Sequence, residues 1–97
     1  MISRHWIGIV RSEMTSAYID HLENTVMPKL NQSEGIQNAY YLKRTVNDGT
    51  EFLIVTEWDC LESIKKFAGN DYDRAVVDPY AKSMMVRYDR KVRHYFI

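Results

Sequence analysis

Two side chains have the types needed for acid–base chemistry on a small organic molecule. His94 lies close to the C-terminus, and a histidine with an ordinary pKa of about 6.5 can take a proton from a phenol or hydroquinone. Arg44 is a cation within an otherwise apolar stretch, where it could hold a carboxylate or phenolate oxygen. The structural alternatives are a histidine at a subunit interface or barrel rim, and an interface salt bridge. We take His94 as the candidate base and Arg44 as the candidate oxyanion partner.

Aromatic and thioether side chains could form the walls of a pocket for a flat, apolar ligand. At this spacing the same side chains also suit a hydrophobic core, and a tryptophan at the end of a strand is commonly a packed core residue. Trp6 has the same two interpretations. The candidate substrate-binding residues are Tyr40, Trp58, Phe67, Tyr72, Tyr80 and Met84.

The remaining reactive side chains form no recognisable constellation. The single cysteine, Cys60, has no partner for a disulfide within the chain, and no cysteine or histidine spacing suggests zinc. His5 and His21 lie far apart in the sequence, so a metal site of three histidines would require a coincidence of folding. We expect no bound metal and no bound cofactor.

Length and charge restrict the class of protein. The chain has 97 residues, which predicts a single domain, 1–97. Its 13 basic and 13 acidic residues form no basic patch, so nucleic acid is not an expected partner. The apolar run near the N-terminus is too short for a signal or membrane helix, which leads us to expect a cytoplasmic protein with no membrane partner.

The first half of the chain predicts a strand, a helix and a hairpin. Residues 6–10 are apolar on both parities, as in a strand buried on two faces. Residues 15–30 predict a helix because apolar side chains recur at every fourth position, and Pro28 is expected to kink its end. Residues 36–46 and 50–58 predict the two strands of the hairpin.

The register of this hairpin depends on its turn. A two-residue turn at Asp48-Gly49 and a three-residue turn with Gly49 in a bulge differ by one position, and a slip of one residue turns every side chain to the other face. We favour the bulged turn. It places six side chains on one face of the sheet, namely Tyr40, Leu42, Arg44, Phe52, Ile54 and Trp58.

A capped helix is predicted directly after the hairpin. Asp59 and Glu62 have the spacing of a capping box, and the apolar stripe of the helix includes Phe67. Gly69-Asn70-Asp71 interrupts this helix, and its aspartate is expected to cap a further helical piece that begins at Tyr72.

Asp78-Pro79 is a second helix start, with a capping residue followed by proline at the first helical position, and predicts a helix over 79–86. Residues 89–97 alternate and end apolar, as a final strand would. A helical layer broken at 69–71 would let a ligand enter between helices and sheet. The alternative is that the broken segment only closes one layer of the core.

The order of elements predicts the fold. Strand, helix, strand, strand, helices and strand form two split units, which indicates an α+β protein with a ferredoxin-like βαββαβ arrangement and a four-stranded antiparallel sheet. The strands are apolar on both parities, whereas the helices can cover only one face. A second copy of the same sheet is the simplest cover for the other face, so we expect a homodimer.

Motifs spread over nearly the whole chain resemble the antibiotic biosynthesis monooxygenase (ABM) domain family. This resemblance implies a dimeric α+β barrel built from ferredoxin-like protomers. Some members of that family oxidise aromatic polyketide intermediates with molecular oxygen and no bound cofactor, and relatives cleave haem. The motifs are Trp6-Ile7-Gly8, the segment EFLIVTEWD at 51–59, FAGND at 67–71, Ala75-Val76-Val77 with Pro79, and Val92-Arg93-His94-Tyr95.

The resemblance gives a functional hypothesis and an alternative. The haem-cleaving branch uses an asparagine on the first strand, a tryptophan on the second helix and a histidine just after it. Here the first strand has no asparagine, Phe67 stands at the helix position, and Val76-Val77-Asp78 replaces the histidine region, so haem degradation is not expected. The hypothesis is a cofactor-independent monooxygenase-like enzyme for a small aromatic or quinol substrate. The alternative is a non-catalytic small-molecule-binding or stress-response module of the same fold.

Overall fold

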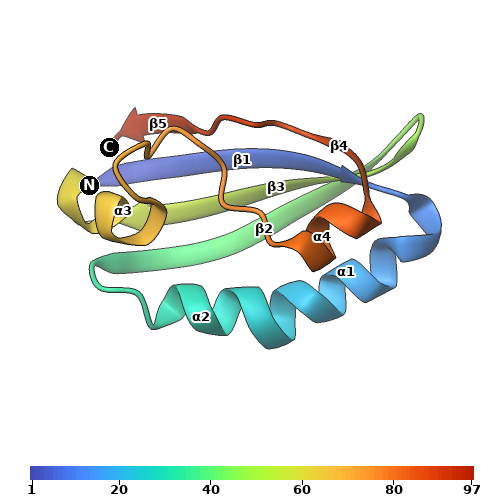
Figure 1. The fold of residues 1–97 in the computed structure, drawn as a ribbon, viewed down its shortest axis with the longest axis horizontal. Helices are drawn as coiled ribbons and strands as arrows, with labels where there is room; N and C mark the ends of the chain where they lie inside the picture. The colour runs from blue at the N-terminus through green and yellow to red at the C-terminus, as the bar shows by residue number, and fades with distance from the viewer.

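One antiparallel sheet forms a layer of the protein, and helices cover one of its faces (Figure 1). The computed structural model describes the whole chain, residues 1–97. The strands are hydrogen-bonded in the order β2-β3-β1-β4, and β5 pairs with β1 as well. The elements in chain order are β1 (Ile2–Val10), the 3₁₀ turn η1 (Ser12–Met14), α1 (Thr15–His21), the π-helical turn η2 (Leu22–Val26), α2 (Met27–Asn31), β2 (Ile36–Val46), β3 (Gly49–Trp58), α3 (Leu61–Ala68), α4 (Pro79–Met84), β4 (Met85–Tyr88) and β5 (Arg93–Phe96).

The register of β1 against β3 decides which side chains face the helices. Ile2 pairs with Trp58 and Gly8 pairs with Phe52. The Trp58 and Phe52 side chains are fully buried in the two hydrophobic clusters of the protein. Because side chains alternate along a strand, the even-numbered residues of β1 and β3 face the helix layer. The odd-numbered residues face the open side of the sheet.

The hairpin register is not the predicted one, and the bulged turn is wrong. Val46 pairs with Gly49 across a two-residue turn of Asn47 and Asp48. A register shifted by one residue reverses the faces. Three side chains that we expected on the helix-covered face lie instead on the open face, namely Tyr40, Leu42 and Arg44.

Contacts from outside the hairpin account for this register. Gly49 is buried against the backbone carbonyl oxygen of Val10, and a side chain at this position would collide with that oxygen. Asp48 in the turn forms an ion pair with Arg87 of β4. Both partners belong to other strands, so the hairpin sequence alone carries no sign of them.

The helix predicted over 15–30 is one helical segment with a π turn in its middle. The π turn η2 immediately precedes α2, in which Pro28 is the second residue. Proline has no N–H to donate to the carbonyl of Asn24, and a π turn is a common way to accommodate a missing bond in the i−4 ladder. The π turn ends at Val26, in the middle of the segment, so the kink predicted at the end of the helix stays a prediction.

Helix α3 begins without the predicted capping box. Its N-cap is Cys60, in an extended conformation and without a side-chain capping bond. The Asp59 carboxylate accepts a hydrogen bond of 2.6 Å from Ser63 Oγ, and Glu62 pairs with Lys65. The helix starts one residue later than predicted, which leaves Asp59 too early in the chain to cap it.

The helical piece predicted from Tyr72 is also wrong. Residues 71–73 form a bend and a turn, Arg74 forms an isolated β-bridge with Lys91, and residues 75–78 have no regular structure. Ala75 N donates to the carbonyl oxygen of Arg90 at 2.8 Å, so the chain here runs extended beside the C-terminal segment. The cap at Asp78 is confirmed, since its side chain accepts a hydrogen bond of 2.8 Å from Ala81 N at the start of α4.

The last edge of the sheet contains two short strands in place of one. Helix α4 ends at Met84 and β4 follows at once, whereas the prediction continued the helix to 86. β4 pairs with Gly8–Val10, and β5 pairs with Ile2–His5 on the same edge of β1. The sheet therefore has five strands, with the fourth position of the ferredoxin-like order divided between β4 and β5.

Two glycines with positive φ offer a matched test of packing. Alanine at Gly35 (φ +84°) would collide with Ser63 and Asp59, whereas alanine at Gly69 (φ +89°) would meet nothing within 4 Å. Each substitution carries a backbone strain of about 1–3 kcal/mol. We expect Gly35→Ala to lower the free energy of unfolding, measured in urea, by clearly more than Gly69→Ala. Equal losses would contradict the collision.

The α+β, ferredoxin-like fold with helices on one face of an antiparallel sheet is confirmed. None of its helices is long and apolar enough to cross a membrane. The open face carries exposed apolar side chains from an edge strand, including Leu42 at 56% and Tyr40 at 39% exposure. The other face is hollowed where the helices meet the sheet.

Candidate functional site

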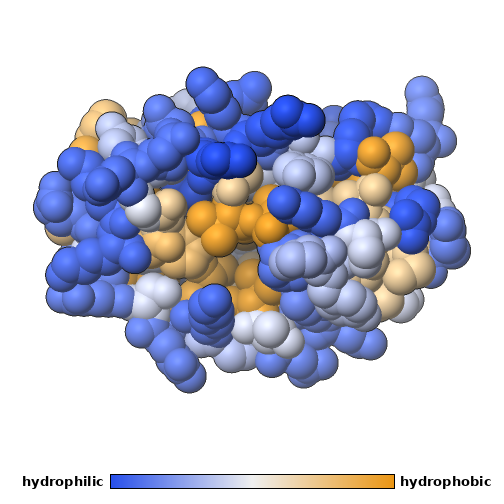
Figure 2. Space-filling view, viewed as in Figure 1, coloured by the Kyte–Doolittle hydropathy of each residue, from blue (hydrophilic) through white to orange (hydrophobic).

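A cavity of about 280 Å³ lies between the helix layer and the sheet. Figure 2 shows a hollow of apolar surface at the centre of the molecule, ringed by hydrophilic residues. Its walls come from every layer of the fold, with Trp6 and Ile54 from the sheet, Leu22 and Val26 from η2, Phe67 from α3 and Val77 from the segment before α4. This size suits a small ligand with few polar groups.

The aromatic walls of the cavity are held in place from behind. A side chain at Gly8 would collide with the Trp6 ring, so the missing side chain lets the ring lie over the strand. Trp6 Nε1 donates a hydrogen bond of 2.7 Å to the carbonyl oxygen of Asp89. Phe67 packs on the buried Trp58 with 5.3 Å between ring centroids. Both walls are thus fixed before a ligand enters.

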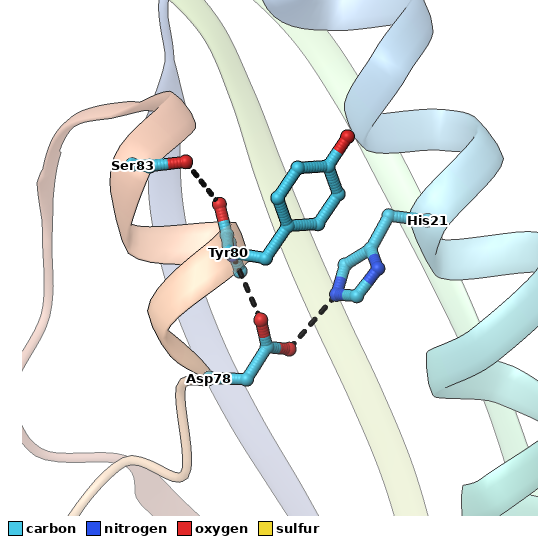
Figure 3. Close-up of polar contacts among 5 residues, drawn as sticks. His21, Asp78, Tyr80 and Ser83 are labelled. Atoms are coloured by element: carbon cyan, nitrogen blue, oxygen red, sulfur yellow. Dashed lines mark hydrogen bonds and ion pairs between the residues drawn. The ribbon is translucent and has the colours of Figure 1, made fainter.

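A histidine and an aspartate form a pair in the cavity wall (Figure 3). His21, the last residue of α1, contacts the Asp78 carboxylate with 2.8 Å between Nε2 and Oδ2. The other carboxylate oxygen accepts from Ala81 N, and the ring of Tyr80 lies edge-on to His21 at 5.0 Å. When neutral His21 donates from Nε2, its proton-free nitrogen is Nδ1, which has no hydrogen-bond partner in the chain.

The charge on Asp78 is stabilised by these contacts. Burial alone would raise its pKa, but the hydrogen bonds from the backbone N–H of Ala81 and from His21 keep the pKa below its ordinary value. Asp78 is therefore a carboxylate at neutral pH. A carboxylate in this position orients an imidazole and stabilises the imidazolium formed when that ring takes a proton.

A tyrosine hydroxyl adds a neutral donor to the cavity wall. Tyr18 is 2% exposed, and burial raises its pKa further above the ordinary value, with a contribution from the charge of Asp78. Its hydroxyl has no hydrogen-bond partner within the chain. No fully buried polar side-chain atom lacks a partner, so this hydroxyl reaches the accessible space of the cavity.

A buried arginine lies on the sheet side of the cavity. Arg4 is only 5% exposed. Its guanidinium donates to the carbonyl oxygens of Tyr72 (2.5 Å) and Arg74 (3.2 Å), and it lies over the Phe67 ring at 5.8 Å. Burial lowers the pKa of Arg4 to about 10, although the charge of Asp73 acts in the opposite direction. Arg4 therefore remains a cation at neutral pH.

His94 supports this arginine from the side away from the cavity. Its Nε2 lies 3.0 Å from Arg4 Nη1, and its Nδ1 lies 3.3 Å from the Asp73 carboxylate. Because arginine can only donate, Nε2 accepts and the ring proton is on Nδ1. Burial lowers the pKa of His94, the charge of Arg4 lowers it further, and Asp73 partly compensates. The His94 ring is thus held neutral, between Arg4 and Asp73.

The lowered pKa of His94 predicts a specific pH dependence of stability. The folded protein binds fewer protons here than the unfolded chain, so stability is complete above the unfolded pKa of about 6.5 and falls with pH toward the folded pKa. We expect wild-type protein to lose free energy of unfolding below about pH 6.5 by more than His94→Gln does. Urea titrations at several pH values measure the difference. Parallel curves would contradict this assignment.

Two solved structures share this architecture over the whole chain. A candidate antibiotic biosynthesis monooxygenase from Bacillus cereus superimposes with a TM-score of 0.63 at 14% sequence identity, covering 100% of this chain and 91% of that one. A candidate antibiotic biosynthesis monooxygenase from Deinococcus radiodurans gives a TM-score of 0.64 at 16% identity, covering 100% and 92%. The chain has the ABM fold. No protein-family model and no curated protein sequence matches it.

Within the ABM fold, only one of the predicted site residues lines the cavity. That residue is Phe67. Trp58 lies behind it, fully buried, with its Nε1 donating to Thr56 Oγ1 at 2.8 Å. Met84 is fully buried in the core beneath α4. The substrate-binding roles of Phe67, Trp58 and Met84 stay predictions. Trp58 and Met84 do not line the cavity, so they could act only through the residues that they support.

Three further predicted residues lie beside residues of the cavity wall. Tyr80 contacts His21, and the ring of Tyr72 packs on His94 at 5.6 Å while its carbonyl holds Arg4. His94 itself contacts Arg4 and does not line the cavity. A direct catalytic role for His94 would require the Arg4 bond to its Nε2 to break.

The other two predicted residues are separated from the cavity by the sheet. Arg44 is on the open face, with a 72% exposed side chain and an ion pair of 2.8 Å to Glu51. That hydrogen bond and charge raise the pKa of Arg44 and lower the pKa of Glu51. Tyr40 lies on the same open face. Neither side chain is near the cavity within one protomer.

The polar residues that do line the cavity were not predicted from the sequence. Arg4 occupies an even position of β1 between Ile2 and Trp6, so strict alternation places a cation on an otherwise apolar face. His21 is adjacent to Leu22 in the helix that covers the sheet, but its partner Asp78 is 57 residues away. The position of Arg4 on the apolar face could be predicted from the strand pattern. The His21–Asp78 contact could not, because only the folded structure brings these two residues together.

Proposed function

We propose that this protein is a cofactor-independent monooxygenase that oxidises a small, flat phenol or quinol in the cavity. The observation that carries the proposal is a preformed apolar cavity with a histidine–aspartate pair in its wall. The ABM fold of the chain agrees with it, since two candidate monooxygenases share that fold. No group of three or more histidine, cysteine or acidic side chains in the chain could hold a metal ion.

The chemistry assigned to this site is activation of the substrate itself. His21, oriented by Asp78, takes the phenolic proton, and the resulting phenolate is electron-rich enough to reduce oxygen directly. At an unsubstituted ring carbon para to a phenol hydroxyl, one oxygen atom becomes a new carbonyl. The other oxygen leaves as water with the displaced ring hydrogen and the phenolic hydrogen. A phenol and one O₂ thus give a quinone and one H₂O, with the substrate as the only reductant.

The cavity walls have a matching role. Trp6 and Phe67 present fixed ring surfaces, and stacked or edge-on aromatic contacts with such walls favour a planar ligand. Tyr18 is a neutral hydroxyl that can donate to the oxygen as charge develops there.

Oxygen uptake with 1,5-dihydroxynaphthalene tests the proposal. Conversion to 5-hydroxy-1,4-naphthoquinone consumes one O₂ per quinone, and ¹⁸O₂ should label one quinone oxygen. We expect protein-dependent uptake above the spontaneous rate, with quinone formed in equal amount. Binding of the naphthalenediol without uptake would contradict catalysis and favour the alternative, a non-catalytic small-molecule-binding or stress-response module.

We also propose that a second copy of the chain covers the open face of the sheet. This face carries exposed Tyr40 and Leu42 on β2 and exposed Tyr95 on β5, apolar side chains that a second copy could cover. A two-fold dimer would bury these residues against their own copies. The same face carries the Arg44–Glu51 pair, which would then lie at or near the interface.

A further inference from the structure

The Arg4 guanidinium is a buried cation without a carboxylate partner. It is 5% exposed, and none of the ion pairs of the protein includes it. The Asp73 carboxylate acts on Arg4 through its charge, but it contacts His94 and forms no ion pair with Arg4. Burial of an unpaired charge is costly, and the two backbone carbonyls and one imidazole around Arg4 are dipoles, which compensate it only in part.

Part of this guanidinium is left without a hydrogen-bond partner in a residue that lines the cavity. Nη1 of Arg4 donates to the carbonyl oxygen of Tyr72 and to His94 Nε2, and Nη2 donates to the carbonyl oxygen of Arg74. A guanidinium carries five N–H groups, so these three contacts leave two unused. Nε makes none of these bonds, and no fully buried polar side-chain atom lacks a partner, so Nε keeps some accessible surface in a residue that lines the cavity.

The remaining charges around the cavity also favour an anion. Lys29 lines it from the exposed side of α2. Asp78 is the only acidic residue among the lining residues, and it is already paired with His21 and with the N-terminus of α4. Apart from His21, the charged lining residues are two cations, Arg4 and Lys29, and one anion, Asp78. The anion that would balance Arg4 is thus missing from the chain itself.

We propose that the ligand of this cavity is a planar aromatic carboxylate, whose carboxylate group binds Arg4 and whose ring lies between Trp6 and Phe67. A carboxylate matches the planar donor geometry of a guanidinium, and an aromatic ring attached to it would fill the apolar part of the cavity. Aromatic carboxylates that carry a phenol or quinol would then be the substrates of the oxidation proposed above, and to that extent the inference rests on the proposed function. The binding preference is independent of turnover.

His94 is a positioning residue for this anion site. By accepting from Nη1 it holds one side of the guanidinium, so that the other side can face the cavity. The groups that face His94 are Arg4 on β1, Asp73 and the Tyr72 ring. A neutral imidazole is required in this arrangement, because a protonated one could no longer accept the bond from Arg4.

Binding of 2-naphthoate and of its neutral analogue 2-naphthamide to the wild-type protein tests this inference without any variant. Neither compound has a phenol, so neither can be turned over by the proposed reaction. Isothermal titration at pH 7.5 should give a dissociation constant at least about tenfold lower for 2-naphthoate, as expected for a charge-assisted bond in a buried site. Equal affinities, tighter binding of the amide, or no binding of either would overturn the proposal.

Variants assign the preference to Arg4. We expect Arg4→Gln to remove the preference for 2-naphthoate and Arg4→Lys to retain part of it. The matched control is Arg90→Gln, since Arg90 is exposed and does not line the cavity. Loss of the preference in Lys29→Gln but not in Arg4→Gln would overturn the assignment. If Arg4→Gln does not fold, the comparison of the two ligands on the wild-type protein and on Arg4→Lys still tests the assignment.

The two proposals fail separately. If 1,5-dihydroxynaphthalene is not oxidised but 2-naphthoate binds more tightly than 2-naphthamide, the cavity is an aromatic-acid site without the proposed oxygenase activity. If oxygen uptake is found and the preference for 2-naphthoate is absent, the enzyme acts on uncharged phenols and the anion site is wrong.

Discussion

Replacement of His21 by glutamine is expected to lower the rate of oxygen uptake with 1,5-dihydroxynaphthalene by about 10²- to 10⁴-fold, the usual contribution of a positioned general base. His21 is the histidine that lines the cavity, and its contact with Asp78 leaves Nδ1 as the nitrogen able to accept a proton. Glutamine has similar reach and can still hydrogen-bond to Asp78, but it cannot take the proton. The loss should therefore be in kcat, with KM little changed.

Two further variants separate chemistry from folding in this prediction. Asp78→Asn keeps an oxygen that can accept from Ala81 N, so α4 should retain its cap while the histidine loses its carboxylate. We expect an intermediate loss of kcat. His5→Gln is the matched control, because His5 faces the open side of the sheet and contacts Ser3 and Tyr95. A His21→Gln enzyme with wild-type kcat would remove His21 from the mechanism.

The general fold could be predicted because its signals are local. Apolar side chains at every fourth position predicted the first helix, and a run that is apolar on both parities predicted the first strand. Asp78-Pro79 predicted the start of α4 with its cap. The errors occurred where a distant contact decided the outcome. The hairpin register depends on Gly49 against Val10, and the segment after α3 is extended because it bonds to residues near Arg90.

The candidate site was harder to predict for the same reason. His21, Asp78 and Arg4 belong to a helix, a cap and a strand that are far apart in sequence, and only the packing of helices on the sheet brings them to one cavity. The prediction instead favoured Arg44, whose position on a strand is visible but whose face depends on the register. One slipped residue in the hairpin moved Arg44 and Tyr40 away from the cavity.

Replacement of Leu42 by glutamate is expected to convert the proposed homodimer to a monomer. Leu42 is 56% exposed on the open face and pairs with Leu53 of β3, so it lies within the apolar surface that a second copy would cover. A two-fold interface would bury the new carboxylate from both copies. An uncompensated buried charge costs about 3–5 kcal/mol, so the dimer dissociation constant should rise at least about 10²-fold.

Sedimentation equilibrium of wild-type and variant proteins measures this change. Thr45→Glu is the matched control, because it adds the same charge to the same strand on the opposite face, where Thr45 pairs with Thr50 and is exposed. We expect a dimer for wild type and Thr45→Glu and a monomer for Leu42→Glu. A wild-type monomer would show that the open face is solvated or takes another partner. Since the cavity walls come from one protomer, a folded Leu42→Glu monomer should still bind 2-naphthoate, which separates the interface from the site.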